Sequence, residues 1–313
     1  MAQIKPHIFF HSNLDSPDEW RAAFATEFEQ FTFSVGSAVT TPESVDVALI
    51  WTLPDEGLER FVNLRAVLSL GAGIDQLDLA RLPRHVPLAR LVDGSLTRTM
   101  VDYAKTAVYR YHRRFHFFER EAQHHRWTFI SPTATAETAV GVLGLGEIGG
   151  EIALALHREG FTVHGWSRSL KQLEGITTHT GRDGLKSMVG RSNIVLNVLP
   201  LTDETRHILG RDLFAQFQMG TCLINMGRGM HLAEADLLAA IASGRVEAAT
   251  LDVASVEPLP PAHPFWGHPN ILMTPHVAGI SRPRTAVTTI AANIRRALAG
   301  ERLLHQVDLD RDY

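Results

Sequence analysis

A strand, a glycine-rich turn and a helix follow one another near the middle of the chain. The apolar run Ala139–Leu143 leads into Gly144-Leu145-Gly146-Glu147-Ile148-Gly149, and an amphipathic segment follows over Glu151–Glu159. In a G-x-G-x-x-G turn, the first glycine allows a tight turn, the second lets the backbone approach a phosphate, and the third lets the helix pack closely. The start of the helix offers N–H groups and a positive dipole end to an anion. This context predicts a pyrophosphate site, whereas three glycines alone would indicate only a tight loop.

Apolar runs alternate with helical patterns through the second half of the chain. Beside Ala139–Leu143, the candidate strands are Phe161–Trp166, Asn193–Val198, Thr221–Asn225, Ala248–Leu251 and Asn270–Met273. The segment Glu234–Ala242 is predicted as a helix, which Gly244 would end. This alternation predicts a doubly wound parallel sheet whose ligands lie at the carboxyl ends of the strands.

The first hundred residues show the same alternation less regularly. Their apolar runs are His7–Phe10, Val45–Trp51, Ala66–Leu70 and Pro87–Leu91. Apolar residues at helical spacing predict one long helix over Thr97–Glu121 and a further helix over Ala286–Leu298. We therefore predict two α/β domains with a cleft between them. Residues 1–101 and 282–313 would form the smaller domain, and residues 102–281 the nucleotide-binding domain.

The charge balance and the single cysteine limit the classes of function. A formal net charge of -4 and an isoelectric point near 6.5 argue against a nucleic-acid binder. Cys222 is the only cysteine and lies in an apolar run, so we expect a core residue and no intramolecular disulfide. No secretory signal and no membrane-spanning run is recognisable, so a cytoplasmic location is the expectation.

The residues after the second strand of the nucleotide-binding pattern indicate which cofactor binds. An acidic residue at this position accepts hydrogen bonds from the ribose of NAD. Here Phe161–Trp166 is followed by Ser167-Arg168-Ser169-Leu170-Lys171, which contains no acid. Arg168 and the serines suit a ribose 2′-phosphate, so NADPH is the predicted cofactor and NADH remains possible. The alternative is a basic surface loop that happens to follow a strand.

Three polar segments follow candidate strands and would enter the same cleft. They are Asn225-Met226-Gly227-Arg228-Gly229, Asp252-Val253-Ala254-Ser255-Val256-Glu257-Pro258 and Thr274-Pro275-His276-Val277-Ala278-Gly279. With the glycine turn they resemble the D-2-hydroxyacid dehydrogenase family, whose arginine, glutamate and histidine appear here in the family's order. The resemblance covers essentially the whole chain and is closest to the glyoxylate/hydroxypyruvate reductase A branch. The stretches that indicate this branch are Leu70-Gly71-Ala72-Gly73-Ile74-Asp75, Trp166-Ser167-Arg168, Leu259-Pro260-Pro261 and Gln306-Val307-Asp308.

The resemblance implies a fold, a reaction and an assembly. The fold would be a Rossmann dinucleotide-binding domain inserted in a smaller flavodoxin-like substrate domain. The reaction would be the NADPH-dependent reduction of small 2-keto acids, glyoxylate and hydroxypyruvate, to the (R)-2-hydroxy acids glycolate and D-glycerate. Family members usually form homodimers, and the long helix with its aromatic-rich end (Phe115, Phe117, Phe118 and Trp127) is a candidate contact.

The chemistry of 2-keto acid reduction requires the residue types of the predicted catalytic trio. The planar fork of Arg228 suits a carboxylate and the adjacent carbonyl better than a lysine would. By resemblance, His276 donates a proton to the developing alkoxide, and Glu257 accepts a hydrogen bond from its other ring nitrogen. Taken alone, Arg228 could be a surface cation and Glu257 a solvated loop acid. His276 could be one of 16 histidines with no special role. Their joint placement at three strand ends favours catalysis.

Further predictions concern the substrate and the nicotinamide. By resemblance, the loop Gly71-Ala72-Gly73 grips the substrate carboxylate with backbone N–H groups, and Trp51 lines the substrate pocket. The alternatives are an ordinary turn and a core tryptophan. Asp252 would orient the nicotinamide carboxamide. The remaining residues assigned to the cofactor site by resemblance are Leu199, Pro200, Met226, Gly227 and His276.

The sequence also bears on other possible functions. The i,i+4 pair His112 and His116 has Arg113 and Arg114 beside it and no carboxylate-rich or cysteine partner nearby, so no metal is expected and both are interpreted as face residues of the long helix. Glu257 stands where formate-oxidising relatives have glutamine, which argues against formate. Larger 2-keto acids such as phenylpyruvate remain alternatives, as does a nicotinamide-sensing, corepressor-like role without turnover.

Overall fold

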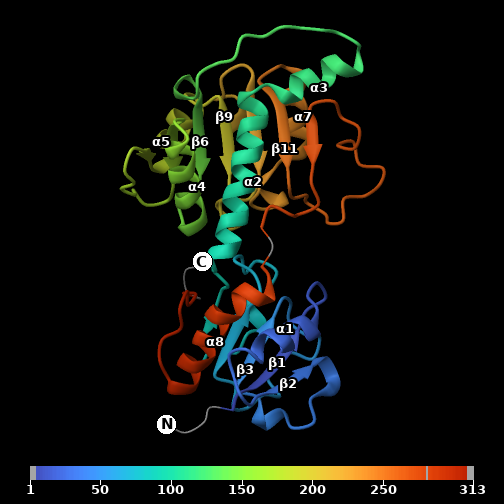
Figure 1. Ribbon diagram of the computed structural model, residues 1–313, viewed down its shortest axis with the longest axis vertical. Coiled ribbons are helices and arrows are strands. Elements are labelled where there is room, and N and C mark those ends of the chain that lie inside the picture. Colours follow the sequence, from blue (N-terminus) through green and yellow to red (C-terminus); the bar gives the residue numbers. More distant parts are fainter. Residues whose placement is uncertain (1–4, 280, 309–313) are drawn as a thin grey trace. The chain divides into compact units, whose positions relative to one another are not determined.

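The computed structural model describes residues 5–279 and 281–308, which fold as two compact α/β units (Figure 1). One unit comprises residues 1–96 and 281–313, and the other comprises residues 97–280. The predicted division after residue 101 would fall inside α2 (Gly94–His112), whereas the two units divide at the first turn of that helix. Both units contain a parallel sheet, so the predicted α/β class is confirmed.

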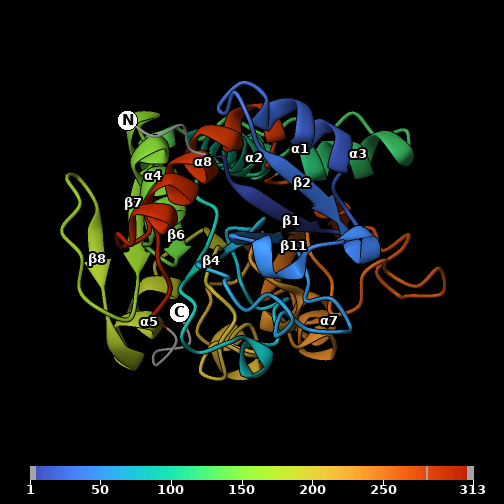
Figure 2. The ribbon, with the colours of Figure 1, turned by 90° about the horizontal axis from the view of Figure 1, so that it is seen from below.

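The unit of residues 1–96 and 281–313 contains a five-stranded parallel sheet in the order β2-β1-β3-β4-β5. Its strands are β1 (His7–His11), β2 (Thr32–Val35), β3 (Val47–Ile50), β4 (Ala66–Ser69) and β5 (Leu88–Ala89). Side chains alternate across a strand, so Ile8 and Phe10 face α1 (Pro17–Phe24) and α8 (Pro283–Ala299), which pack together (Figure 2). Phe9 lies on the opposite face against Phe61. Both faces of this sheet are therefore buried, as is typical of parallel sheets.

The unit of residues 97–280 contains a seven-stranded parallel sheet in the order β12-β11-β10-β9-β6-β7-β8. Its strands are β6 (Ala139–Leu143), β7 (Thr162–Trp166), β8 (Thr177–His179), β9 (Ile194–Asn197), β10 (Thr221–Asn225), β11 (Val246–Leu251) and β12 (Ile271–Met273). From β6 the chain extends first to one side, through β7, and then to the other, through β9, so the order reverses at β6. A doubly wound sheet binds its ligands at the carboxyl ends of the strands beside such a reversal.

All seven strands of this sheet end at the same level. Their last residues pair with one another across the sheet. These residues are His179, Trp166, Leu143, Asn197, Asn225, Leu251 and Met273. The loops after these strands therefore leave one edge of the sheet together.

Helices cover both faces of the seven-stranded sheet. They are α2, α3 (Phe115–Gln123), α4 (Glu147–Arg158), α5 (Gly181–Val189), α6 (Arg211–Phe214) and α7 (Glu234–Ala242). Residues of α5, α6 and α7 form one core with Leu223 and Leu251. On the other face, α2 crosses the sheet, and the Tyr111 and Thr250 hydroxyls are hydrogen-bonded at 2.7 Å (Figure 1). No helix in the described ranges is both long and apolar enough to cross a membrane.

The prediction of one long helix over 97–121 is wrong. The helix breaks between α2 and α3, where Arg114 has a left-handed backbone (φ 58°) and its guanidinium contacts Glu247 at 3.0 Å. The sequence contains no glycine or proline at this break. The break is instead accompanied by a tertiary ion pair, which the local sequence does not indicate. His112 and His116 are consequently not surface residues of one helix. Both are buried: His112 bonds to Thr138 at 2.9 Å, and His116 to Glu247 at 3.1 Å.

The strands that the sequence analysis missed lie at sheet edges. β2 and β8 contain no buried residue, so they lack the apolar run that predicted the others. In contrast, β6, β10 and α7 have the predicted bounds. The predicted helix over 286–298 begins earlier, at Pro283.

Candidate active site

The glycine turn has the geometry that a phosphate requires. Gly144 has φ +101°, and a Cβ on Gly149 would lie 1.8 Å from the carbonyl oxygen of Gly144. A Cβ on Gly146 would meet nothing within 4 Å, so open space lies over the second glycine. Gly146 also immediately precedes α4 and supplies no capping side chain. Open space above the first turn of a helix fits an anionic phosphate, so these residues suit a dinucleotide.

The third glycine is expected to be needed for the fold itself. In Gly149→Ala the new Cβ forces α4 away from the turn, and overpacking of this kind costs about 1–3 kcal/mol. The adjacent Gly150→Ala is the matched control, because its Cβ meets nothing within 4 Å and alanine favours a helix by up to about 1 kcal/mol. Thermal unfolding should therefore show a lower midpoint for Gly149→Ala and an unchanged or higher one for Gly150→Ala. Equal midpoints would contradict this close packing.

The loop after β7 presents two cations. Its backbone is held by side chains, since Thr180 donates to the Arg168 carbonyl and Thr178 to the Lys171 carbonyl, at 2.8 and 2.7 Å. The Arg168 and Lys171 side chains are exposed and form no ion pair with any residue of 5–279 or 281–308. The Ser167 hydroxyl is buried and donates within the loop, to the Ser169 carbonyl at 2.7 Å. The two free cations, with the exposed Ser169, are therefore the groups available to an anion.

Glu257 and His276 form the pair that the sequence predicted. The His276 Nδ1 lies 2.8 Å from the Glu257 Oε2, and the Glu257 Oε1 accepts the Ala254 N–H at 3.0 Å. Burial alone would raise the pKa of Glu257, but these bonds and the charge of Arg228 hold it below its usual value. An ionised Glu257 accepts a proton-bearing Nδ1, so the imidazole has a fixed orientation and its Nε2 can serve a substrate.

A buried carboxylate holds the histidine loop. Asp252 is 1% exposed; its Oδ1 accepts the Val277 N–H at 2.9 Å and its Oδ2 the Ala278 N–H at 2.8 Å. The Thr274 hydroxyl also bonds to Oδ1, at 2.5 Å, and therefore accepts the hydrogen bond from the Tyr103 hydroxyl at 2.7 Å. Burial raises the pKa of Tyr103 to about 12, which keeps this hydroxyl protonated. Both oxygens of Asp252 thus position the loop of His276, and its predicted contact with the nicotinamide stays a prediction.

Arg228 lies just beyond β10, in a turn that admits no additional side chain. A Cβ on Gly229 would lie 1.9 Å from the Ala254 carbonyl carbon, so the Arg228 turn packs directly on the loop that leads to Glu257. The Arg228 guanidinium donates to the Gly227 carbonyl at 2.9 Å. Its charge is also one of the groups that lower the pKa of Glu257. The structure therefore brings all three predicted catalytic residues to the ends of β10, β11 and β12.

Three buried polar residues beside Arg228 were missed as site residues. Asn197, Asn225 and His231 are each 0% exposed and are linked by hydrogen bonds. The two asparagines occupy the last positions of β9 and β10. Polar residues at the ends of apolar strands were the available signal in the sequence.

The predicted cofactor residues differ in how exposed their side chains are. Leu145 and Met226 are 5% and 3% exposed, and the Leu145 side chain fills the space beside Gly165. Leu199 is also buried, while Pro200 is half-buried and Gly227 has no side chain. Glu147 is exposed and Ile148 half-buried at the start of α4.

The predicted carboxylate loop in the five-stranded unit differs from expectation at its first residue. The Gly71 N–H donates to the Ser69 hydroxyl at 3.1 Å, so it is not available to a ligand. The structure records no partner for the N–H groups of Ala72 and Gly73 among residues 5–279 and 281–308. A Cβ on Gly71 would lie 2.7 Å from the half-buried Trp51 ring. Trp51 thus packs against this loop, which explains why glycine is required at position 71.

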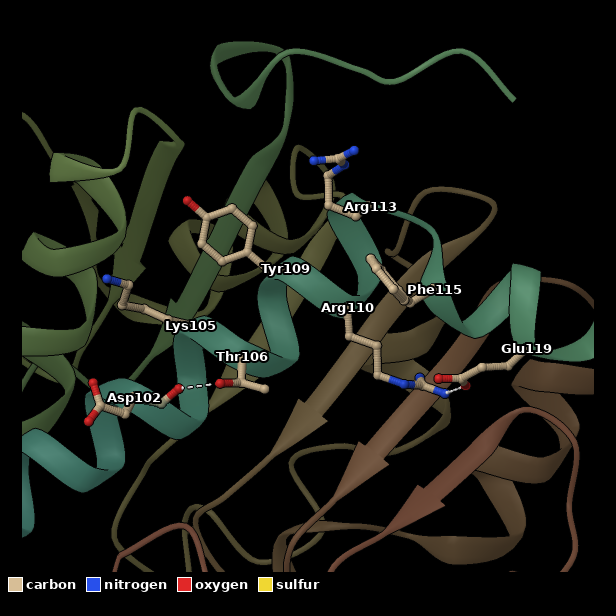
Figure 3. Close-up of a pocket in the computed structure, with 8 residues that line it drawn as sticks. All are labelled: Asp102, Lys105, Thr106, Tyr109, Arg110, Arg113, Phe115 and Glu119. Atoms are coloured by element: carbon tan, nitrogen blue, oxygen red, sulfur yellow. Dashed lines mark hydrogen bonds and ion pairs between the residues drawn. The ribbon is translucent and has the colours of Figure 1, made fainter. Parts of the chain in front are cut away.

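Two other features of the unit of residues 97–280 do not belong to the strand ends. A cavity of about 700 Å³ lies along α2 and α3, and the residues that line it are shown in Figure 3. Separately, ligand-type atoms of His116, Cys222 and Glu247 lie within 4.8 Å of one another. Arg114 and Arg120 lie 3.0 and 3.9 Å from Glu247, and burial raises the pKa of the Cys222 thiol. Two adjacent cations and a protonated thiol disfavour a metal ion there.

Comparison with known proteins identifies the family. Residues 106–278 match the family model "D-isomer specific 2-hydroxyacid dehydrogenase, NAD binding domain". The chain is 40% identical over 277 residues to glyoxylate/hydroxypyruvate reductase A of Yersinia enterocolitica, covering 87% of this chain and 88% of the relative. It is 39% identical over 308 residues to the reductase of the same name from Serratia proteamaculans, covering 96% and 98%.

Solved structures agree with this assignment. A D-isomer specific 2-hydroxyacid dehydrogenase from Xanthobacter autotrophicus, in complex with NADPH and MES, has a TM-score of 0.95 at 41% identity, covering 99% of this chain and 100% of that one. The NADPH-dependent glyoxylate/hydroxypyruvate reductase of Sinorhizobium meliloti, in complex with NADP and sulfate, has a TM-score of 0.90 at 34% identity, with the same coverage. This chain belongs to the D-isomer specific 2-hydroxyacid dehydrogenase family and is an NAD(P)-dependent enzyme of that family.

Proposed function

We propose that this protein reduces small 2-keto acids, glyoxylate and hydroxypyruvate first, to glycolate and D-glycerate with NADPH. The observation that carries the proposal is the hydrogen bond of 2.8 Å between His276 and Glu257, formed beside Arg228 at the strand ends. The relatives named glyoxylate/hydroxypyruvate reductase A support the choice of substrate.

Different residues of the chain would bind the substrate, hold the cofactor and donate the proton. The guanidinium of Arg228 would bind the substrate carboxylate and the keto oxygen, which withdraws electron density from the carbonyl carbon. The glycine turn and the loop of Arg168 would hold NADPH, which supplies the hydride to that carbon. The Nε2 of His276 would then donate its proton to the oxygen that becomes the hydroxyl. Glu257 would stabilise the protonated imidazole before this transfer and keep its orientation throughout. The Ala72 and Gly73 amides are proposed as further donors to a carboxylate.

The test is the steady-state oxidation of NADPH, and separately of NADH, with glyoxylate, hydroxypyruvate and phenylpyruvate. Turnover with NADPH and either small keto acid is the expected result. A clear preference for phenylpyruvate would replace the proposed substrates by larger keto acids. Tight binding of NADPH without any turnover would contradict a reductase and favour a nicotinamide-sensing role.

The preference for NADPH is proposed to depend on Arg168. In Arg168→Ala, the loss of a charge-assisted bond to the 2′-phosphate, worth about 1.5–3 kcal/mol, should raise the KM for NADPH about 10- to 100-fold. The KM for NADH should stay unchanged, since NADH carries no phosphate at that position. Arg158→Ala is the control, because Arg158 is exposed in the last turn of α4, at the end opposite the glycine turn. Equal effects on both cofactors would refute the assignment of Arg168.

We also propose that a second copy of the chain covers the outer face of α2 and α3. The cavity there is lined by Tyr109 and Phe115, and Phe115 is 57% exposed (Figure 3). Trp127 and Phe129, which follow α3, are 101% and 84% exposed. Exposed aromatic side chains of this number mark an interaction surface. Light scattering should then report twice the mass of one chain.

A further inference from the structure

The buried histidine next to Arg228 joins two loops of the candidate site. The His231 Nδ1 lies 3.0 Å from the Arg228 N–H nitrogen, and its Nε2 lies 3.1 Å from the Pro200 carbonyl oxygen. These contacts link the turn after β10 to the loop after β9. His231 is 0% exposed, so bulk water cannot replace either bond.

These contacts define the protonation state of the ring. A backbone N–H can only donate, so the Nδ1 facing Arg228 must be an unprotonated acceptor. A carbonyl oxygen can only accept, so the Nε2 facing Pro200 must carry the proton. The Asn197 amide also donates to Nδ1, at 3.0 Å. His231 is therefore a neutral imidazole with its hydrogen on Nε2, and a second proton would break the bond with Arg228.

The surrounding groups leave the Arg228 peptide little freedom. The Asn225 amide donates to the Arg228 carbonyl at 3.1 Å, opposite the bond from the Arg228 N–H to His231. The Asn197 amide connects the two supports, because it also donates to the Asn225 side-chain oxygen at 2.9 Å. A Cβ on Gly227 would lie 2.9 Å from the Asn197 nitrogen and 3.0 Å from the His231 Nδ1. The network therefore fixes both peptide groups of the residue whose side chain is proposed to bind the substrate.

We propose that His231 is a positioning residue which sets the Arg228 turn and the Leu199-Pro200 loop together through its two ring nitrogens. This inference rests on the proposed function, in which Arg228 binds the keto acid, and on the predicted contact of the Leu199-Pro200 loop with the cofactor. The Nδ1 side governs the placement of Arg228 and hence the binding of the keto acid. The Nε2 side governs the loop and hence the binding of NADPH. If His231 only filled space, every substitution of it would weaken the binding of the keto acid and of NADPH alike.

Two substitutions separate the two nitrogens. In His231→Asn, the side-chain oxygen lies near the place of Nδ1 and keeps an acceptor for the Arg228 N–H, but nothing reaches Pro200. In His231→Gln, the longer amide reaches Pro200 as a donor but loses the acceptor beside Arg228. His231→Leu lacks both groups and reports the cost of the cavity and the unpaired polar atoms. His112→Asn is the control, since His112 is another buried histidine, bonded to Thr138 and outside the strand-end loops.

The expected result is a split between two binding measurements. His231→Gln should raise the KM for glyoxylate, and the inhibition constant of the unreactive analogue oxamate, about tenfold, with the Kd for NADPH nearly unchanged. His231→Asn should do the reverse, weakening NADPH about tenfold in a fluorescence titration without keto acid. His231→Leu should show both losses, and His112→Asn should lower only the unfolding temperature. If Asn, Gln and Leu at position 231 weaken both ligands alike, the proposal is wrong.

A second measurement does not depend on turnover. Nitrogen-15 spectra of histidine-labelled protein, in which the His231 signal is assigned by its loss in His231→Leu, should show a neutral ring with the hydrogen on Nε2 at neutral pH. A protonated ring or a hydrogen on Nδ1 would overturn the proposal. If the wild-type protein reduces no 2-keto acid, the proposed function fails. The spectra and the NADPH affinities of the Asn and Gln variants would still decide the role of His231.

Discussion

Replacing His276 by glutamine should lower kcat about 10²- to 10⁴-fold, the range that a general acid usually contributes. Glutamine retains a polar group for Glu257, so the loop geometry is kept while the transferable proton is lost. The Kd for NADPH should remain close to that of the wild type, because the loss concerns the step that protonates oxygen. The measurement is the steady-state kinetics with glyoxylate, together with a fluorescence titration of NADPH.

The matched control for this variant is His263→Gln. His263 also pairs with a glutamate, since its Nε2 lies 3.1 Å from the Glu234 Oε2, but no role in catalysis is proposed for it. Its kcat should stay within about twofold of the wild type, as is usual when a residue outside the reacting groups changes. Comparable losses in the two variants, or near-normal kcat in His276→Gln, would show that His276 is not the proton donor.

Replacing Arg228 by alanine should lower kcat/KM about 10³-fold or more, through both a lower kcat and a higher KM for the keto acid. The guanidinium is proposed to bind the ground-state carboxylate and to stabilise the developing negative oxygen, so both constants change. Arg228→Lys keeps the charge without the planar fork and should recover only part of the loss. The kinetics of both variants with glyoxylate provide the test.

Surface arginines provide the comparison for Arg228. Arg211 has a side chain that is 85% exposed, and it lies 3.5 Å from Asp236. Such a pair contributes little, about 0–1 kcal/mol, so Arg211→Ala should keep wild-type kinetics. An Arg228→Ala variant whose KM for glyoxylate is unchanged would remove Arg228 from the substrate site. If NADPH binding were also lost, the variant would instead show a collapsed turn, which circular dichroism and the unfolding temperature would reveal.

Residue patterns were sufficient to predict those strands and helices whose apolar residues are buried in the core. The run Ala139–Leu143, with its three glycines, predicted both β6 and the turn that precedes α4. The His276–Glu257 hydrogen bond was anticipated from the family resemblance. That both residues lie at one edge of the sheet was anticipated from the strand pattern, because parallel strands of a doubly wound sheet present their carboxyl ends at one edge.

The features that were not predicted depend on contacts between distant parts of the chain. The break at Arg114 accompanies an ion pair with Glu247, which is 133 residues away. The role of Asp252 in holding the loop of His276 required knowledge of four donors, on Thr274, Val277 and Ala278 and, through Thr274, on Tyr103. The neutral state of His231 follows only from the two groups that flank its ring. No periodicity or motif encodes such distances.

The level ends of the seven strands divide the unit of residues 97–280 into a part that resists change and a part that tolerates it. Deleting one residue within β9 would turn every following side chain of the strand to the opposite face and disrupt the packing on both faces of the sheet. Lengthening the loop after β10, β11 or β12 would leave the pairing of residues between neighbouring strands unchanged. New substrate ranges can therefore arise from this scaffold by exchange of loops alone, with the hydrophobic core inherited unchanged.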